Sequence, residues 1–179
     1  MTYKLANRVH KVQPSFTLQM ATRAAEMRAD GIDVINFSVG EPDFNTPSHI
    51  ISAGKEAMDD GFTKYTAGPG MIEFRNAICD KLDRENGITY EPADILVSNG
   101  EKQSLYNVCQ ALFNEGDEVV VFRPYWVSFP EFVRLADAEP VLVDTIAENN
   151  FEPDFNDLKN KLSPNIKGVI LNSPSNPTG

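Results

Sequence analysis

Residues 98–104, Ser-Asn-Gly-Glu-Lys-Gln-Ser, contain the groups that could bind a phosphate, because a predicted strand passes there directly into a predicted helix. The N–H groups at a helix start, the helix dipole and a lysine such as Lys102 together favour an anion. Gly100 allows close approach of the backbone to a ligand. An ordinary capped helix start with a solvated lysine is the competing interpretation, since neither common glycine-rich phosphate-loop pattern is present.

Two further candidate segments each follow a predicted strand. Trp126, the only tryptophan, comes after the strand at 119–122, and an asparagine-rich and proline-rich turn at 172–179 comes after the strand at 169–171. Ligands of α/β proteins bind at the carboxyl ends of parallel strands. An indole can stack on a flat ring, and an asparagine amide can hold a phenolate-type oxygen. A packing aromatic and a simple turn are the alternatives.

Two glycine-containing turns complete the set of candidate segments. In residues 38–44, Ser-Val-Gly-Glu-Pro-Asp-Phe, the N–H of Gly40 could bind a carboxylate. In residues 63–70, a glycine-rich loop contains the phenol of Tyr65. A strand-ending turn and a surface turn are the ordinary interpretations of these two segments.

The pattern of apolar residues predicts a chain of alternating strands and helices. Residues 128–131, Ser-Phe-Pro-Glu, form a capping-box pattern with proline in the first turn. Runs without polar alternation suit strands covered on both faces, so we predict an α/β fold with a largely parallel sheet. The predicted strands are 34–37, 95–97, 119–122, 141–143 and 169–171, and the predicted helices are 17–29, 48–60, 71–85, 100–113, 129–136 and 154–162.

Composition excludes several classes of protein. The 179 residues include 26 acidic and 16 basic side chains, giving a net charge of −10, which argues against nucleic acid as a partner. No stretch approaches the roughly 20 apolar residues that span a bilayer, and the first residues contain no apolar leader, so we expect a cytoplasmic protein without a membrane partner. Cys79 and Cys109 are expected to be small buried hydrophobes in a reducing compartment, and no metal site is expected.

Together these segments resemble the pyridoxal-phosphate-dependent aminotransferases of the aspartate aminotransferase family (class I/II, fold type I). The resemblance implies a three-layer α/β sandwich with a largely parallel sheet. Residues 1–46 would be the N-terminal arm and a small-domain segment, and residues 47–179 the first half of the cofactor-binding large domain, truncated at Gly179. The matching motifs are S-V-G-E-P-D-F-x-T-P (38–47), K-Y-T-x-G-P-G (64–70), N-G-E-K-Q (99–103), R-P-Y-W (123–126) and N-S-P-S-N-P-T-G (172–179).

The resemblance also implies a role for each candidate residue. The family's Schiff-base lysine, the aspartate that pairs with the ring nitrogen and the arginine that binds the substrate carboxylate lie beyond the last motif. We therefore assign no catalytic residue and expect the 179-residue chain to be inactive alone. The implied roles are substrate carboxylate binding for Gly40, phosphate binding for Gly100, Glu101 and Lys102, stacking on the cofactor ring for Trp126, a hydrogen bond to its phenolic oxygen for Asn176, contact with substrate for Trp126 and Asn176, and contact with the cofactor phosphate across a homodimer interface for Tyr65.

The implied activity of the parent enzyme is transfer of an amino group from an amino acid, with L-aspartate favoured, to 2-oxoglutarate. Alanine, aromatic or kynurenine specificity remains open. Prephenate activity is disfavoured, because relatives that accept prephenate have a lysine in the arm where this chain has Gln13. The alternative of another class is a non-catalytic half-chain that acts as a binding or assembly module. The resemblance also predicts a cis bond between Asn176 and Pro177.

Overall fold

The computed structural model describes residues 3–179 and divides into two compact units. The first unit comprises residues 3–16 and 100–179, and the second comprises residues 17–99. The first unit contains α1 (Asn7–Lys11), α5 (Gly100–Leu112), β1 (Glu118–Arg123), α6 (Phe129–Leu135), β2 (Glu139–Ile146), the short 3₁₀ helix Ala147–Asn149, β3 (Glu152–Pro153), α7 (Phe155–Lys161) and β4 (Ile166–Ile170).

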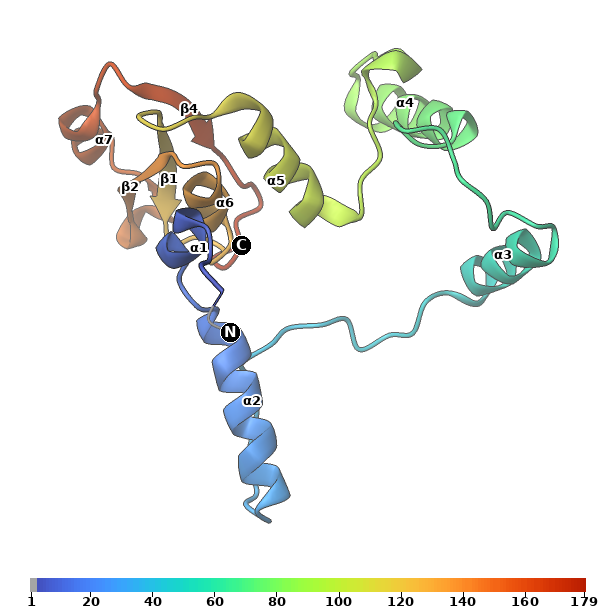
Figure 1. Cartoon of the computed structure of the whole chain (residues 1–179), viewed down its shortest axis with the longest axis horizontal. Coiled ribbons are helices and arrows are strands. Elements are labelled where there is room, and N and C mark those ends of the chain that lie inside the picture. Colours follow the sequence, from blue (N-terminus) through green and yellow to red (C-terminus); the bar gives the residue numbers. More distant parts are fainter. Residues whose placement is uncertain (1–2) are drawn as a thin grey trace. The chain divides into compact units, whose positions relative to one another are not determined.

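The sheet of the first unit has the strand order β3-β2-β1-β4 and is largely parallel, as predicted. Strand β1 pairs in parallel with β2, with Val121 opposite Leu142, and in parallel with β4, with Val121 opposite Ile170. Only the two-residue β3 runs antiparallel, at the outer edge of β2. Figure 1 shows α7 on the left of these strands and α5 and α6 on their right, so the helices form the outer layers of a three-layer α/β unit.

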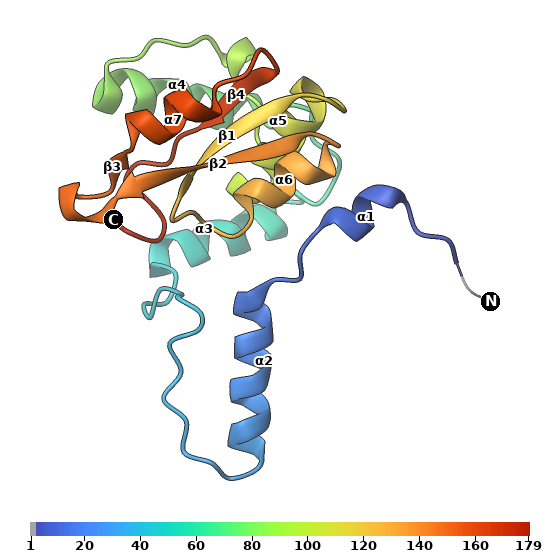
Figure 2. The same ribbon diagram turned by 90° about the vertical axis from the view of Figure 1, so that its left-hand side faces the viewer.

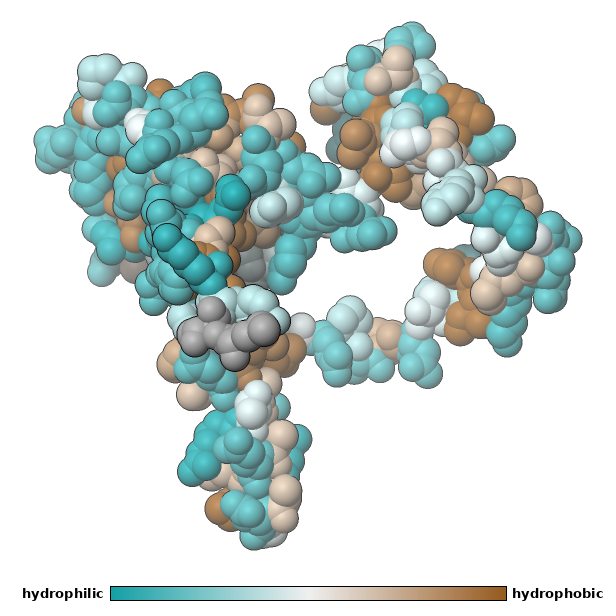
Figure 3. All heavy atoms as spheres, in the orientation of Figure 1, coloured by the Kyte–Doolittle hydropathy of each residue, from teal (hydrophilic) through white to brown (hydrophobic). Residues whose placement is uncertain are grey.

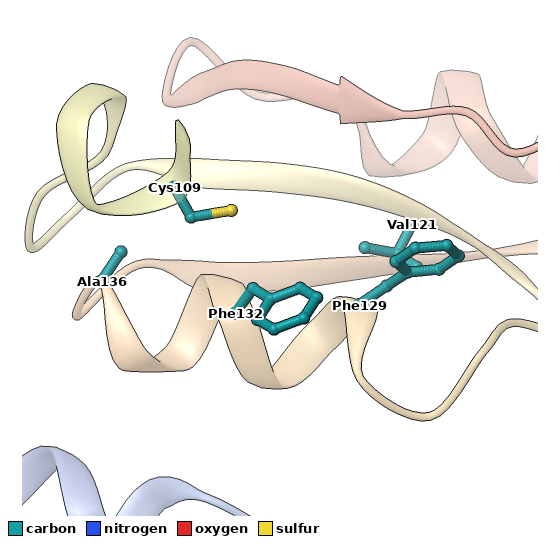
Figure 4. Close-up of a cluster of buried hydrophobic side chains, with 5 residues drawn as sticks. All are labelled: Cys109, Val121, Phe129, Phe132 and Ala136. Atoms are coloured by element: carbon teal, nitrogen blue, oxygen red, sulfur yellow. The ribbon is translucent and has the colours of Figure 1, made fainter. Parts of the chain in front are cut away.

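The core lies between α6, α5 and one face of β1. Val119 and Val121 alternate with Val120 along β1, so their side chains point to the α6 face and that of Val120 to the opposite face. All three are almost completely buried. Figure 4 shows the cluster that contains Val121 packed between the helices and the sheet. Its buried members are Cys109 of α5, Val121 of β1, and Phe129, Phe132 and Ala136 of α6 and its end.

The start of α6 differs from the predicted capping box. Proline occupies the first turn as expected, but the side chain of Ser128 makes no capping hydrogen bond and its backbone is helical (φ −82°, ψ −20°). The Glu131 carboxylate, the other member of the predicted box, also has different partners. It accepts a hydrogen bond from the backbone N–H of Gln13 at 3.0 Å and pairs with Arg134 one turn later.

The N-terminal segment of the first unit lies against α6 and is held by polar contacts. The α1 helix buries none of its residues. Lys11 Nζ donates to Asp137 Oδ1 at 3.0 Å, and Arg8 Nη1 lies 3.7 Å from the other oxygen of the same carboxylate. Asp137 directly follows the C-cap of α6 and has a positive φ of 61°. Figure 2 shows α1 as a short helix close to the N-terminal end of the chain.

Helix α7 is fixed to β2 by one carboxylate and one ammonium group. Asp157 Oδ2 accepts from the backbone N–H of Asp144 at 2.8 Å and from Lys161 Nζ at 2.7 Å. Lys161 Nζ also donates to the Leu142 carbonyl at 2.7 Å. The hydrogen bond from Lys161 is the main cause that lowers the pKa of Asp157, and the bond from Asp144 adds to it.

The second unit is helical and contains α2 (Phe16–Ala29), α3 (Ser48–Asp59), α4 (Ile72–Asn86) and the 3₁₀ helix Pro92–Asp94. Arg75 of α4 donates to the Pro92 carbonyl at 2.9 Å, and the N–H of Val97 donates to the Pro69 carbonyl at 3.0 Å. Few side chains are buried here. Figure 3 shows apolar atoms at the surface of α3 and α4, where Ile50, Met58, Ile72 and Phe74 are exposed.

Two predicted strands are wrong. Residues 34–37 and 95–97 form no strand, so among residues 3–179 no strand precedes α5. Both segments are rich in β-branched residues, but a strand also needs a neighbour for its backbone N–H and C=O groups. Among residues 3–179, the sheets contain only β1 to β4, and Val97 bonds to the 69–70 turn instead.

The cysteines are both buried and free, as predicted. Burial raises the pKa of the Cys109 thiol, because removal from water disfavours the thiolate. Within the described part of the chain, no helix has the length and apolar character needed to cross a membrane.

Candidate functional site

Three of the predicted site residues meet in one pocket of the first unit. The pocket has a volume of about 210 Å³ and is lined by Glu101, Trp126, Phe129, Asn172 and Asn176. Glu101 comes from the start of α5, Trp126 and Phe129 from the segment between β1 and α6, and the asparagines from the segment after β4. The pocket therefore lies where the carboxyl ends of two parallel strands meet a helix start, as expected for ligand sites in α/β proteins.

The helix start at this pocket provides backbone donors. Gly100, Glu101 and Lys102 are the first three residues of α5, and the first N–H groups of an α-helix have no acceptor inside the helix. Gly100 has a φ of +79°, which glycine adopts without strain. Gly100 and Lys102 are both exposed. The helix begins as predicted, although the predicted strand before it is absent.

Trp126 is half-buried, and its indole makes edge-to-face contacts with two phenylalanines of α6. The ring centroids of Trp126 and Phe129 are 5.4 Å apart at an interplanar angle of 87°, and those of Trp126 and Phe132 are 6.0 Å apart at 64°. Such edge-to-face contacts are favourable for aromatic quadrupoles. Lys102 Nζ lies 5.0 Å from the indole centroid, in the range of a cation–π contact.

The turn after β4 has a folded backbone that leaves an asparagine amide accessible. The backbone N–H of Asn176 donates to Asn172 Oδ1 at 2.6 Å, and the N–H of Gly179 donates to the Ser175 carbonyl at 2.7 Å. Asn176 itself is exposed. The bond from Asn176 to Pro177 is cis, which confirms the prediction, and so are the bonds before Pro124 and Pro174.

A second cavity of about 270 Å³ adjoins this site and shares Phe129, Asn172 and Asn176 with it. Its other lining residues include Tyr125 and Thr178. Sequence reasoning had not assigned a role to Asn172 or Phe129. Asn172 could have been found from its position just after a predicted strand, four residues before Asn176. For Phe129, the sequence shows only that the residue lies at a proline-containing helix start.

The remaining two predicted residues belong to the second unit and are described only within it. Gly40 lies in an irregular segment, with open space at the position that a Cβ would occupy. Tyr65 is fully exposed. The roles of both residues stay predictions.

The donor set of the pocket fits one kind of ligand. Backbone N–H groups at a helix start suit an anion such as a phosphate, the indole offers a flat face, and the Asn176 amide can donate to an oxygen on the ring. These groups come from three chain segments and meet at a single pocket, so they are complementary to a phosphorylated aromatic ring. Among residues 3–179 no group of acidic, histidine or cysteine side chains has the arrangement of a metal site.

Fold and pocket thus define an α/β protein with a ligand site at the carboxyl edge of a largely parallel sheet. Residues 32–179 match the family model for aminotransferase class I and II. The chain belongs to this family.

Individual relatives agree with this assignment. The chain is 47% identical over 176 residues to the aspartate aminotransferase of Bacillus subtilis (strain 168) and 48% identical over 176 residues to that of Geobacillus stearothermophilus; both matches cover 98% of this chain and 45% of the relative. Among solved structures, aspartate aminotransferase from Thermus thermophilus with maleate superposes with a TM-score of 0.92 at 41% identity, covering 98% of this chain and 46% of that one. The chain spans about half the length of the relatives that it matches.

Proposed function

We propose that this chain is the cofactor-binding N-terminal half of a pyridoxal-phosphate-dependent aminotransferase that transfers an amino group from L-aspartate to 2-oxoglutarate. The observation that supports this proposal is the pocket that joins the start of α5, the Trp126 indole and Asn176. The similarity to proteins named aspartate aminotransferase favours aspartate as the donor.

Each residue would have a binding or orienting task. The backbone N–H groups at Gly100, Glu101 and Lys102 would hold the cofactor phosphate, because the helix dipole favours the anion there. Trp126 would support the face of the pyridine ring, and the Asn176 amide would donate to its phenolic oxygen. When bound, pyridoxal phosphate supplies the electron sink of amino-group transfer.

The substrate would be held by backbone and side-chain groups. The backbone N–H of Gly40 would donate to the substrate α-carboxylate, while Trp126 and Asn176 would also contact the substrate at the cofactor. None of these groups has the basicity to move the α-proton. The chemistry therefore needs the lysine that the family resemblance predicts beyond residue 179.

The assembly and location are part of the same proposal. We propose a homodimer in which Tyr65 crosses the interface to the neighbour's cofactor phosphate, and its complete exposure is compatible with that contact. Residues 1–46 would be an arm and a small-domain segment, and residues 47–179 the first half of the large domain. A cytoplasmic location agrees with two free buried cysteines.

A chimera tests this proposal directly. Residues 1–179 would be joined to the remaining C-terminal part of the Bacillus subtilis relative, and the purified protein assayed with 2-oxoglutarate and aspartate, alanine, aromatic amino acids or kynurenine. We expect turnover with aspartate, and a matched Trp126→Ala chimera should bind the cofactor about two- to tenfold more weakly through loss of ring contact. A folded chimera without turnover, or an unchanged affinity in the Trp126→Ala protein, would contradict the proposed site.

A further inference from the structure

The contact between Lys102 and Trp126 is a feature of the site that phosphate binding alone does not explain. Lys102 Nζ lies over the indole, 5.0 Å from its centroid. Trp126 lines the pocket with Glu101, Phe129, Asn172 and Asn176, and among the described residues Lys102 is not part of that lining. The side chain of Lys102 therefore contacts the indole without being among the residues that line the pocket.

Two phenylalanines also contact the indole. Phe129 and Phe132 are steeply inclined to it, at interplanar angles of 87° and 64°. A cation over a ring face is attracted by the aromatic quadrupole, so the Lys102 ammonium group opposes displacement of the indole. Lys102 is exposed, so its ammonium group reaches this position without burial.

From this geometry we infer that Lys102 is a positioning residue, whose side chain holds the Trp126 indole through a cation–π contact and acts on the cofactor ring only through that indole. The backbone N–H of the same residue remains available at the helix start. The inference rests on the proposed function for the identity of the ligand, but the contact itself is a property of the chain without ligand.

The first experiment measures the indole without any ligand. Trp126 is the only tryptophan, so quenching of intrinsic fluorescence by acrylamide reports its accessibility alone. Replacing Lys102 with Met keeps a long side chain and removes the charge; an exposed cation–π contact of about 0.5–1 kcal/mol then predicts about two- to fivefold more frequent exposure of the ring.

Two matched variants make this measurement specific. Lys102→Arg should quench like the unaltered chain, because a guanidinium also binds an indole face. Lys159→Met removes an exposed lysine from α7 and should have no effect. Equal quenching in the Lys102→Met and unaltered chains, or a Lys102→Arg chain that behaves like Lys102→Met, would overturn the inference.

The second experiment uses pyridoxamine 5′-phosphate, which lacks the aldehyde and so cannot condense with lysines. Measured by calorimetry, Lys102→Met should weaken the binding of pyridoxamine 5′-phosphate about two- to fivefold, because the same cation–π energy is lost. In a Trp126→Leu chain, Lys102→Met should cause no further loss, as a double-mutant cycle requires for an effect transmitted through the indole.

The alternatives give different results in that cycle. An equal loss in the Trp126→Leu chain would mean that the Lys102 ammonium acts on the phosphate directly, and tighter binding by Lys102→Met would mean that the ammonium occupies the face needed by the ligand. Either result overturns the inference. If the unaltered chain does not bind pyridoxamine phosphate, the proposed cofactor site fails, while the acrylamide experiment still decides the role of Lys102.

Discussion

Replacing Gly168 with alanine tests how closely β4 packs on the core. An added Cβ would lie 2.8 Å from Phe113 Cζ and 3.0 Å from Cε1, whereas ordinary contacts begin near 3.4 Å. The Phe113 ring cannot move away freely, because it packs against both buried clusters of the first unit. Such overpacking costs about 1–3 kcal/mol, and the smaller entropy of the unfolded alanine chain offsets about 0.4–1 kcal/mol of it.

We therefore expect Gly168→Ala to lower the free energy of unfolding by about 1–2 kcal/mol. Urea unfolding followed by Trp126 emission measures this change, since Trp126 and Gly168 belong to the same unit. Phe113→Leu removes the clashing ring atoms, so the double variant should lose less than the two single changes added together. An unchanged midpoint for Gly168→Ala, or strict additivity in the double variant, would refute the argument from the close approach.

Three other predictions follow from contacts described above. The pKa of Asp157 is lowered in the folded state, so its carboxylate stabilises the fold above the unfolded pKa, and this contribution is lost as the pH falls below about 4. Asp157→Asn should therefore make the free energy of unfolding fall less steeply on the acid side of a stability–pH curve. An unchanged acid side would contradict this reasoning. Gly70→Ala should lower the thermal midpoint of the second unit, at a cost of about 1–3 kcal/mol. The reason is that φ is +104° at Gly70 and that a Cβ there would lie 2.8 Å from Val97 Cγ2. Gly54→Ala in α3, where the space around the glycine is open, is the control and should be neutral or stabilising by up to about 1 kcal/mol. The polypeptide 1–179 alone should show no turnover of aspartate with 2-oxoglutarate, and a borohydride-trapped lysine adduct together with turnover would show otherwise.

Local signals in the sequence were sufficient for α2 to α7, whereas α1 (Asn7–Lys11) was not predicted. Each predicted helix from 17–29 to 154–162 is present with ends shifted by at most a residue or two, because apolar spacing and breakers such as Gly87 act within a few residues. The strands were predicted correctly only where each one lies beside another strand with which its backbone can pair. The run 119–122 pairs with 141–143 on one side and with 169–170 on the other, whereas 34–37 has the same β-branched character and no strand beside it.

The site was predictable in part for the same reason. Glu101, Trp126 and Asn176 belong to recognisable motifs, so their meeting at one pocket could be expected. The partners that hold them come from contacts between distant segments. The inclined contact of Phe132 with Trp126 depends on how α6 lies on the sheet. The Glu131 carboxylate binds the N–H of Gln13, 118 residues earlier, instead of capping its own helix.

The way in which α1 is attached has a consequence for handling the protein. Its docking on α6 depends on Arg8, Lys11 and Asp137 rather than on buried apolar surface. Charges at a surface are screened within about 3 Å in 1 M salt but only within about 10 Å in 0.1 M salt, while the apolar core is not weakened by such screening. Concentrated sodium chloride would therefore detach the first residues without melting the sheet, and trypsin would then cleave after Arg8 and Lys11 while sparing the body of the first unit.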